Sequence, residues 1–206
     1  MYQGKKISLV IPARNEERLI GPTLEGATET IDRIYVIDDG STDNTAEVVG
    51  KYASIDPRVE LIQHEENRGV GQAIITGYLR SSEDGYDISV VVGGDNQMPL
   101  EQVEDLLDPI IEGKADYTKG NRFLMPDTGL EDMPWTRMFP NAMISAMTKV
   151  ASGYYKIFDV VDGFTAISKR GIDLVDWSKA WKGYGYPMDF LVRLNGYGLK
   201  VKDVPR

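Results

Sequence analysis

The chain has 206 residues, of which 42% are hydrophobic and 27% charged, as in ordinary soluble globular domains. Acids outnumber Lys and Arg by 32 to 23, for a net charge of -9, so nonspecific nucleic-acid binding is not expected. There is no cysteine and only one histidine, which excludes disulfides, thiolate zinc sites and sites that need two imidazoles. No apolar run is long enough for a membrane span or a signal peptide. We therefore expect a soluble, intracellular protein whose chemistry depends on carboxylates, hydroxyls and amides.

Four short β-branched runs in the first half of the chain predict buried parallel strands. Helix signals lie between them, such as Ser41-Thr42-Asp43 ahead of Thr45 to Tyr52. A helix is expected from Leu100 to Gly113, kinked or ended by Pro109, and then a fifth strand from Ala115 to Lys119. The alternation predicts a Rossmann-like, doubly wound α/β/α sandwich with a mostly parallel central sheet. The four runs are residues 7–11, 34–37, 59–62 and 88–92.

The second half of the chain is less regular. Arg122 to Pro134 carries proline, glycine and acid without periodicity, which predicts a long surface loop beside a site. A wide apolar stripe at helical spacing runs from Trp135 to Val150; core packing is the favoured interpretation and contact with lipid the alternative. A strand at 164–168, a helix at 189–194 and a strand at 199–204 are expected to follow.

Polar side chains follow three of the predicted strands at their carboxyl ends, where open α/β sheets bind ligands. Asp38 and Asp39 follow the second strand, and carboxylates there can accept hydrogen bonds from a base N–H or from ribose hydroxyls. After the fourth strand, Gly93 and Gly94 leave room for a ligand, while Asp95 offers oxygen ligands that suit Mg²⁺ or Mn²⁺ with a diphosphate. Turn and helix-cap chemistry is the alternative; it accounts for Ser41 but not for two adjacent acids after a buried strand.

Four motifs occur in the order VIPARNE, IDDGSTDNT, NRGVGQA and GDNQMP. In this order and spacing they resemble the family 2 glycosyltransferases with the GT-A fold, and most of all the dolichyl-phosphate mannose synthase and polyprenyl-phosphate glycosyltransferase branch. The resemblance covers nearly the whole chain. It implies one catalytic domain over residues 1–206, with a nucleotide-sugar-binding half at 1–120 and an acceptor-side half at 121–206. The implied reaction is inverting transfer of a hexose from a GDP-mannose or UDP-glucose type donor to a polyprenyl or dolichyl phosphate.

The resemblance also implies roles for individual residues. Asp95 and Gln97 match the metal and diphosphate ligands of an Asp-x-Asp-x-Gln pattern, with Mg²⁺ or Mn²⁺ as cofactor. Gly93 replaces the first acid of that pattern and removes one possible metal ligand. Arg122 matches a Gly-Ser-Arg element whose guanidinium binds phosphate of the donor or the acceptor, the alternative being an ordinary surface arginine. The implied nucleotide-sugar-binding residues are Pro12, Ala13, Arg14, Glu16, Asp38, Asp39, Arg68, Gly69, Gly71, Gly94 and Asp95.

Three acids are candidates for a general base. Asp159 and Asp162 lie in a segment that resembles Asp-Pro-x-x-Gly-Phe, with valine in place of proline, and Asp189 lies where many family members have an acid at a helix start. Turn and N-cap roles are the alternatives. A lipid phosphate is already ionised and needs no strong base, whereas a hydroxyl acceptor needs one. His64, beside Gln63, is expected to be a solvated loop histidine without a role.

Two further functions remain open at this stage: a glycosyltransferase with a saccharide or other hydroxyl acceptor, and a non-catalytic nucleotide-sugar-binding module. A pyrophosphorylase is disfavoured because no Gly-rich loop follows Val10, and a dehydrogenase because Gly69-Val70-Gly71 lacks a third glycine. The branch implies peripheral work at the cytoplasmic face of a membrane. Six basic residues suit an anionic membrane or, equally, a solvated basic face: Lys169, Arg170, Lys179, Lys182, Lys200 and Lys202.

Overall fold

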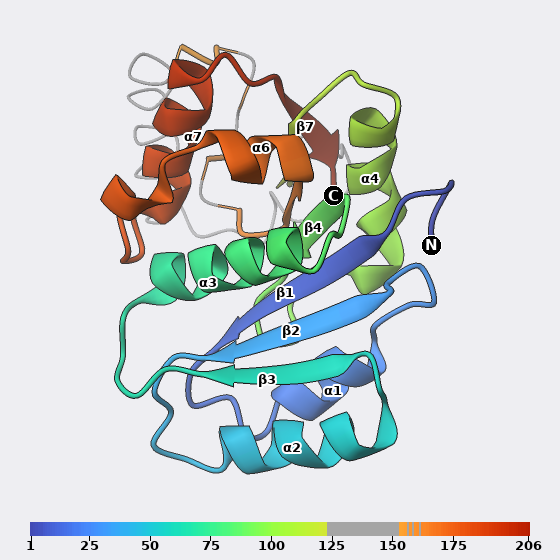
Figure 1. The fold of residues 1–206 in the computed structure, drawn as a ribbon, viewed down its shortest axis with the longest axis vertical. Coiled ribbons are helices and arrows are strands. Elements are labelled where there is room, and N and C mark those ends of the chain that lie inside the picture. The colour runs from blue at the N-terminus through green and yellow to red at the C-terminus, as the bar shows by residue number, and fades with distance from the viewer. Residues whose placement is uncertain (123–152, 156, 158, 161) are drawn as a thin grey trace.

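The computed structural model describes residues 1–122, 153–155, 157, 159–160 and 162–206. Apart from Arg122, the expected loop at 122–134 lies outside the described residues, as does the apolar stripe from Trp135 to Val150. The described residues form a single twisted sheet with helices packed on both of its faces (Figure 1). This arrangement confirms the expected α/β/α sandwich.

The sheet has seven strands in the order β3-β2-β1-β4-β6-β5-β7. β1 pairs in parallel with β2 and β4, and β2 pairs in parallel with β3. β6 is antiparallel to both of its neighbours, β4 and β5, while β7 pairs in parallel with β5. The sheet is therefore mostly parallel, as expected. The strands are β1 (Ile7–Ala13), β2 (Arg33–Asp38), β3 (Val59–Gln63), β4 (Ile88–Val91), β5 (Tyr117–Asn121), β6 (Thr165–Ser168) and β7 (Val201–Pro205).

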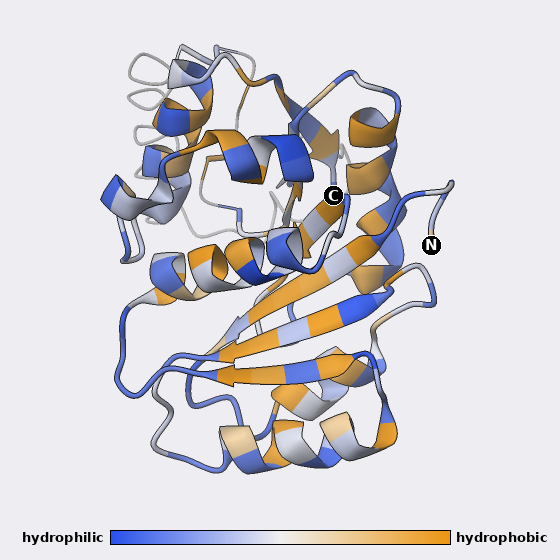
Figure 2. Ribbon diagram, viewed as in Figure 1, coloured by the Kyte–Doolittle hydropathy of each residue, from blue (hydrophilic) through white to orange (hydrophobic). Residues whose placement is uncertain are grey.

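Two apolar clusters, one on each face of the sheet, hold the helices in place. Helices α1, α2 and α4 contribute to one cluster, and α3, α6 and α7 to the other. Figure 2 shows the strands between them as mainly hydrophobic, as expected for strands covered on both faces. The helices are α1 (Ile20–Glu25), α2 (Thr45–Ile55), α3 (Val70–Glu83), α4 (Val103–Ile111), α6 (Lys169–Leu174) and α7 (Tyr186–Gly196), with 3₁₀ turns η1 (Leu100–Gln102) and η2 (Trp177–Lys179).

Helix α3 lies unusually close to the sheet, and this closeness positions its first turn over the ends of β1 and β2. A Cβ atom added to Gly77 would lie 2.3 Å from Cγ1 of Val10, so only glycine fits at this crossing. Beneath it, the buried Ser8 hydroxyl lies 2.7 Å from that of Ser81 on α3. These contacts hold the second half of α3 against β1, while Gly69, just before the helix, lies at the carboxyl edge of the sheet.

Several element boundaries differ from the expected ones. Pro109 does not end α4, which continues to Ile111. β5 and β7 each begin two residues later than expected, and α7 begins three residues before Asp189. The short helices α1 and α6 were not expected: α1 contains Gly21 and Pro22, and its Leu19 cap makes no side-chain hydrogen bond. α6, by contrast, has Ser168 as an N-cap that accepts a hydrogen bond from the Gly171 N–H, so of the two only α1 lacks a local start signal and depends on tertiary packing.

Candidate active site

A cavity of about 450 Å³ opens at the carboxyl ends of β1, β2 and β4. This is the edge at which open α/β sheets bind ligands. The start of α3 and the segment before α7 complete its walls, the latter through Gly183 and Tyr184. The expected nucleotide-sugar residues that line it are Pro12, Ala13, Arg14, Glu16, Asp39, Gly69, Gly94 and Asp95.

The remaining expected residues, Asp38, Arg68 and Gly71, are not among those that line the cavity. Asp38 is buried at the end of β2, where its Oδ1 accepts a hydrogen bond from the Ser41 backbone N–H at 3.0 Å. Its Oδ2 accepts one from Gln63 Nε2 at 3.3 Å. Arg68 donates its backbone N–H to Asp39, and Gly71 packs against the segment before α7. In this structure Asp38 therefore holds the turn after β2, while Asp39 faces the cavity.

Asp39 is held by three donors although it lies at the cavity wall. Its side chain accepts hydrogen bonds from the backbone N–H groups of Arg68 and Gly69, each at 2.8 Å. His64 Nδ1 donates to its Oδ1, also at 2.8 Å, and the other ring nitrogen of His64 lies 3.0 Å from the Thr76 hydroxyl. These contacts fix the orientation of Asp39 before any ligand arrives.

The expectation that His64 is a solvated loop histidine is wrong. Its exposed fraction is 8%, and both ring nitrogens have partners. Its polar neighbours in the sequence gave no sign of this, because the partner Asp39 is 25 residues away. Since the imidazole supports an acid at the cavity wall, His64 is a positioning residue of the site.

Two carboxylates, those of Glu16 and Asp95, lie at the part of the cavity formed by the turn after β4. Burial, followed by the negative charges of Asp95 and Asp43, raises the pKa of Glu16. A Cβ atom added to Gly93 would lie 3.0 Å from Oδ1 of Asp95. A side chain at position 93 would therefore share the surroundings of Asp95, as the acid in the family pattern would.

This donor set fits a hard divalent cation. Asp95 and Glu16 offer carboxylate oxygens at the cavity, whereas Gln97 is exposed and lies outside the lining, two residues from Asp95. Carboxylate and amide oxygens are the ligand type that Mg²⁺ and Mn²⁺ prefer. In the part of the chain that the structure describes, no three His, Cys, Asp or Glu side chains cluster closely enough to hold a metal. A cation here must therefore complete its shell with water and substrate phosphate, as Mg²⁺ does at sites with one or two carboxylates.

A second charged cluster lies at the ends of β5 and β7. Arg122 donates from Nε and Nη2 to Asp159, at 2.7 and 3.1 Å. Asp162 Oδ1 accepts from Arg206 Nη1 at 2.7 Å and from the Phe164 backbone N–H at 2.8 Å. Asp162 Oδ2 is buried without a hydrogen-bond partner among the described residues, with Arg122 Nε 3.7 Å away. The structure thus brings Arg122, Asp159 and Asp162 together, as the resemblance implies.

Lys119 belongs to the same cluster and was missed by the sequence analysis. Its side chain is fully buried in β5 and donates a hydrogen bond to the backbone carbonyl of Asp162. Desolvation lowers the pKa of Lys119 to about 8, although the nearby carboxylates, Asp162 first, act in the opposite direction. The sequence of β5 is Tyr-Thr-Lys-Gly-Asn, a polar stretch in which a lysine is not conspicuous, so no sequence signal indicated this contact.

Asp189 lies away from the cavity lining. It is in the first turn of α7, whose N-cap is Gly185, so the N-cap alternative is wrong. Its Oδ2 accepts from the Trp181 backbone N–H at 2.9 Å and from Arg193 Nε at 2.6 Å. Asp189 therefore fixes the segment before α7, which forms one wall of the cavity.

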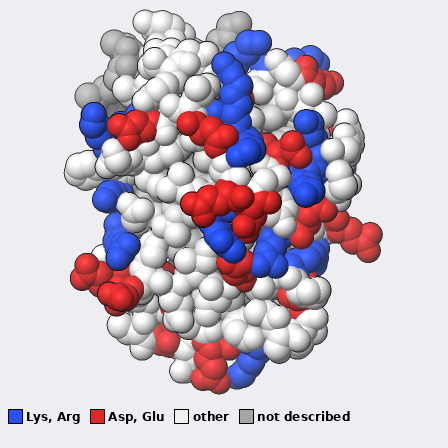
Figure 3. Space-filling model, in the orientation of Figure 1, with Lys and Arg blue, Asp and Glu red and all other residues white. Residues whose placement is uncertain are grey.

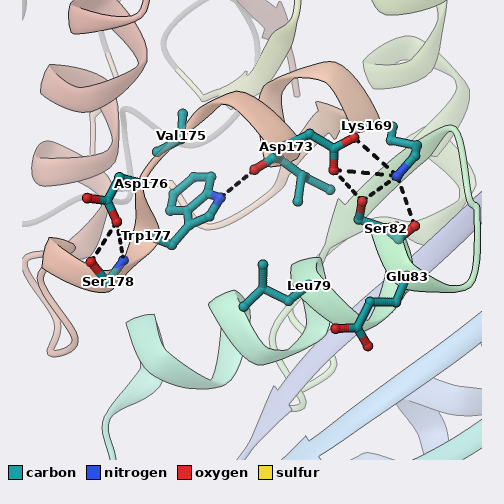
Figure 4. A pocket seen from close by; sticks show the side chains of 10 residues that line it. Leu79, Ser82, Glu83, Lys169, Asp173, Val175, Asp176, Trp177 and Ser178 are labelled. Carbon is teal, nitrogen blue, oxygen red and sulfur yellow. Dashed lines mark hydrogen bonds and ion pairs between the residues drawn. The ribbon is translucent and has the colours of Figure 1, made fainter.

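A larger cavity, about 540 Å³, lies between α3, α6 and η2 (Figure 4). Lys169, the only basic residue among the described ones that line it, is already engaged: its Nζ lies 2.9 Å from the Ser82 carbonyl oxygen and 3.2 Å from Asp173 Oδ2. The Trp177 indole donates to the Ile172 carbonyl at 2.8 Å. None of the expected site residues lines this cavity. Size alone therefore does not identify the site.

The basic residues of the last third of the chain do not form a uniform patch. Figure 3 shows Lys and Arg interspersed with acids on the face it presents. Three of the six form ion pairs: Lys169 with Asp173, Arg170 with Asp116 and Lys179 with Asp176. Across the described ranges, no helix is both long and apolar enough to span a bilayer.

Solved structures of glycosyltransferases share this architecture. The chain superposes on glucosyl-3-phosphoglycerate synthase from Mycobacterium tuberculosis, in complex with Mn²⁺ and UDP-glucose, with a TM-score of 0.74 at 21% identity. The match covers 98% of this chain and 69% of that one. The sheet, its helices and the position of the cavity define the GT-A fold of nucleotide-sugar-dependent glycosyltransferases.

The family follows from the sequence comparison. Residues 8–174 match the model of glycosyl transferase family 2, and the chain belongs to this enzyme family. It is 30% identical to the UDP-N-acetylglucosamine--dolichyl-phosphate N-acetylglucosaminyltransferase of Methanococcus voltae, over 98% of this chain and 84% of that protein. It is 28% identical to the polyprenol monophosphomannose synthase of Mycolicibacterium smegmatis, over 96% of this chain and 75% of that protein. The expected family, branch and fold are confirmed.

Proposed function

We propose that this glycosyltransferase moves a hexose from a nucleotide-diphosphate sugar, of the GDP-mannose or UDP-glucose type, to a polyprenyl or dolichyl phosphate. The names of the Methanococcus and Mycolicibacterium relatives support a lipid-phosphate acceptor. The enzyme would work at the cytoplasmic face of a membrane, because its acceptor is anchored there. Oxygen of the acceptor phosphate attacks the anomeric carbon, the bond to the donor diphosphate breaks, and configuration inverts.

In this proposal the nucleoside and the diphosphate of the donor occupy different parts of the cavity. Pro12, Arg14 and Asp39 would bind the nucleoside, with Asp39 held in position by His64 and the Gly69 turn. Asp95 and Gln97, with Glu16 beside them, would hold Mg²⁺ or Mn²⁺. The bound cation would neutralise charge on the leaving diphosphate. Most of the acceleration then comes from positioning and electrostatic stabilisation.

The observation that carries the acceptor assignment is the pairing of all three candidate bases with arginine. Asp159 is held by Arg122, Asp162 by Arg206 and Asp189 by Arg193. A carboxylate engaged in this way is a poor acceptor of a substrate proton, whereas a phosphate acceptor has no proton to lose. Arg122 has 38% of its side chain exposed and can offer its guanidinium to a phosphate. This arrangement favours a phosphate acceptor over a hydroxyl.

The test compares two acceptors that differ only in the phosphate. The purified enzyme with Mn²⁺ is incubated with UDP-glucose, UDP-N-acetylglucosamine or GDP-mannose, and with either undecaprenyl phosphate or undecaprenol in detergent. Mass spectrometry of the lipid extract should find a glycosylated product only with the phosphate, and none with Asp95→Ala. Transfer to undecaprenol at a comparable rate, or to neither lipid, would contradict the proposal.

A further inference from the structure

The segment from Trp181 to Gly185 forms the cavity wall that faces the start of α3. It is fixed on both sides: the Lys182 carbonyl accepts a hydrogen bond from the Gly71 backbone N–H at 2.8 Å, and the Trp181 N–H donates to Asp189 at 2.9 Å. Gly183 and Tyr184 at its tip line the cavity. We call this segment the aromatic wall.

The glycines at the start of α3 leave room for the aromatic wall. A Cβ atom on Gly69 would lie 2.4 Å from the Lys182 carbonyl oxygen, and one on Gly71 would lie 2.6 Å from that of Trp181. Gly69 also has a φ of +93°, which side chains other than glycine rarely adopt. The glycine turn and the aromatic wall are therefore built against each other, with no space for a side chain between them.

Tyr184 at the tip of the wall is 94% exposed although it lines a cavity. The Trp181 indole lies beside the backbone on either side of Tyr184. Cβ atoms on Gly183 and Gly185 would lie 3.2 and 3.3 Å from Trp181 Nε1, so the indole lies against both glycines that flank Tyr184. An aromatic ring held at a cavity mouth without cover presents an apolar face that a bound ligand can bury.

We infer that Tyr184 is a donor-binding residue that stacks on the nucleobase of the bound nucleotide sugar. The inference rests on the proposed function, since it assumes that the cavity takes a nucleotide. The wall contacts Gly69 directly, and the Gly69 N–H holds Asp39, the acid assigned to the nucleoside. The aromatic wall and this acid therefore border the same end of the cavity. Every nucleobase offers a π face to an aromatic ring, so Tyr184 would add affinity whichever base the donor carries.

The test measures nucleotide binding by tryptophan fluorescence, since Trp181 lies within the wall. Wild type, Tyr184→Ala and Tyr184→Phe are titrated with UMP, GMP, UDP-glucose and GDP-mannose in the presence of Mn²⁺. Tyr184→Ala should lower the affinity for the preferred nucleoside monophosphate and for the matching nucleotide sugar by the same factor, about tenfold. Tyr184→Phe should keep wild-type affinity. In the transfer assay Tyr184→Ala should raise KM for the donor and leave kcat unchanged.

Ile55→Ala is the matched control, because Ile55 is 80% exposed at the end of α2 and outside the cavity lining; it should change nothing. Equal affinity of wild type and Tyr184→Ala would overturn the inference and leave the proposed function standing. A loss of affinity confined to nucleotide sugars would overturn the nucleobase assignment, because it would mean that Tyr184 contacts the hexose instead. If wild type binds no nucleotide at all, the proposed function itself fails.

Discussion

The two charged regions of this enzyme hold their acids in different ways. At the donor cavity, Asp39 is fixed by two backbone N–H groups and an imidazole, and Asp95 accepts only the Gln97 N–H among the hydrogen bonds found for it. In the cluster at the ends of β5 and β7, Asp159 and Asp162 are paired with guanidinium groups. Backbone donors orient a carboxylate without cancelling its charge, whereas an arginine does both. In the proposed reaction the first region would receive the donor with its cation, and the second would receive the acceptor phosphate through Arg122.

The largest effect is expected from a substitution that removes the charge of Asp95 and keeps its size. Asp95→Asn should lower turnover by about 10² to 10³-fold, because the diphosphate loses its main cation-binding carboxylate. Steady-state transfer rates at saturating Mn²⁺ measure this. Glu101→Gln, which removes an exposed acid on the nearby turn η1, should retain full rate. An equal loss of turnover in both variants would contradict a specific role for Asp95, since both remove one negative charge.

The buried Lys119 makes the stability contributed by the second region depend on pH. Its pKa is lowered to about 8 in the folded protein, so between pH 8 and 10 the unfolded chain binds a proton that the folded chain does not. The free energy of unfolding therefore rises with pH in this window, by up to about 3 kcal/mol relative to Lys119→Met. Urea unfolding at pH 8, 9 and 10 tests this, and parallel pH curves for the two proteins would contradict it.

Replacing Gly69 tests whether the donor cavity depends on the aromatic wall. Gly69→Ala places a Cβ atom 2.4 Å from the Lys182 carbonyl oxygen, at a φ of +93°. It should cost about 2 to 4 kcal/mol of stability and raise the donor KM at least tenfold. Gly85→Ala is the control: its φ is +78°, but nothing lies within 4 Å of the added atom. It should cost about 1 kcal/mol through backbone strain alone and leave KM unchanged.

The smallest expected effect concerns the acid that the family pattern has and this chain lacks. Gly93→Asp places a second carboxylate beside Asp95, at a position without positive φ. It should lower the Mn²⁺ concentration for half-maximal activity by about tenfold. Gly93→Asn has the same shape as Gly93→Asp but no charge, and it should lower this Mn²⁺ concentration much less. A Gly93→Asp variant with unchanged metal dependence would show that the cation does not bind at this turn.

Much of the donor cavity could be predicted because parallel strands bring their carboxyl ends to one edge. The segments after β1, β2 and β4 are far apart in the sequence, yet topology alone places them together. Which of two neighbours faces the ligand could not be predicted, since Asp38 turns into the hydrogen bonds of its own turn while Asp39 faces the cavity. That choice depends on local backbone geometry rather than on residue type.

Contacts across long stretches of sequence were beyond prediction for a different reason. His64 meets Asp39, and Lys119 meets the Asp162 carbonyl, 43 residues away. The aromatic wall likewise meets Gly69 through Lys182, which lies far along the chain. Spacing patterns report the period of one element and not the neighbour that packs against it. Such partners become visible only in three dimensions.

The measurement that tests the account most directly is the melting temperature of the enzyme with UDP or GDP, with and without Mn²⁺, repeated on Asp95→Ala. Ligand that binds only the folded state raises the melting temperature by mass action. The account predicts that one nucleotide stabilises the wild-type enzyme when Mn²⁺ is present and that Asp95→Ala removes this shift. A nucleotide shift that is independent of both metal and Asp95, or no shift with either nucleotide, would contradict a donor site at the carboxyl ends of β1, β2 and β4.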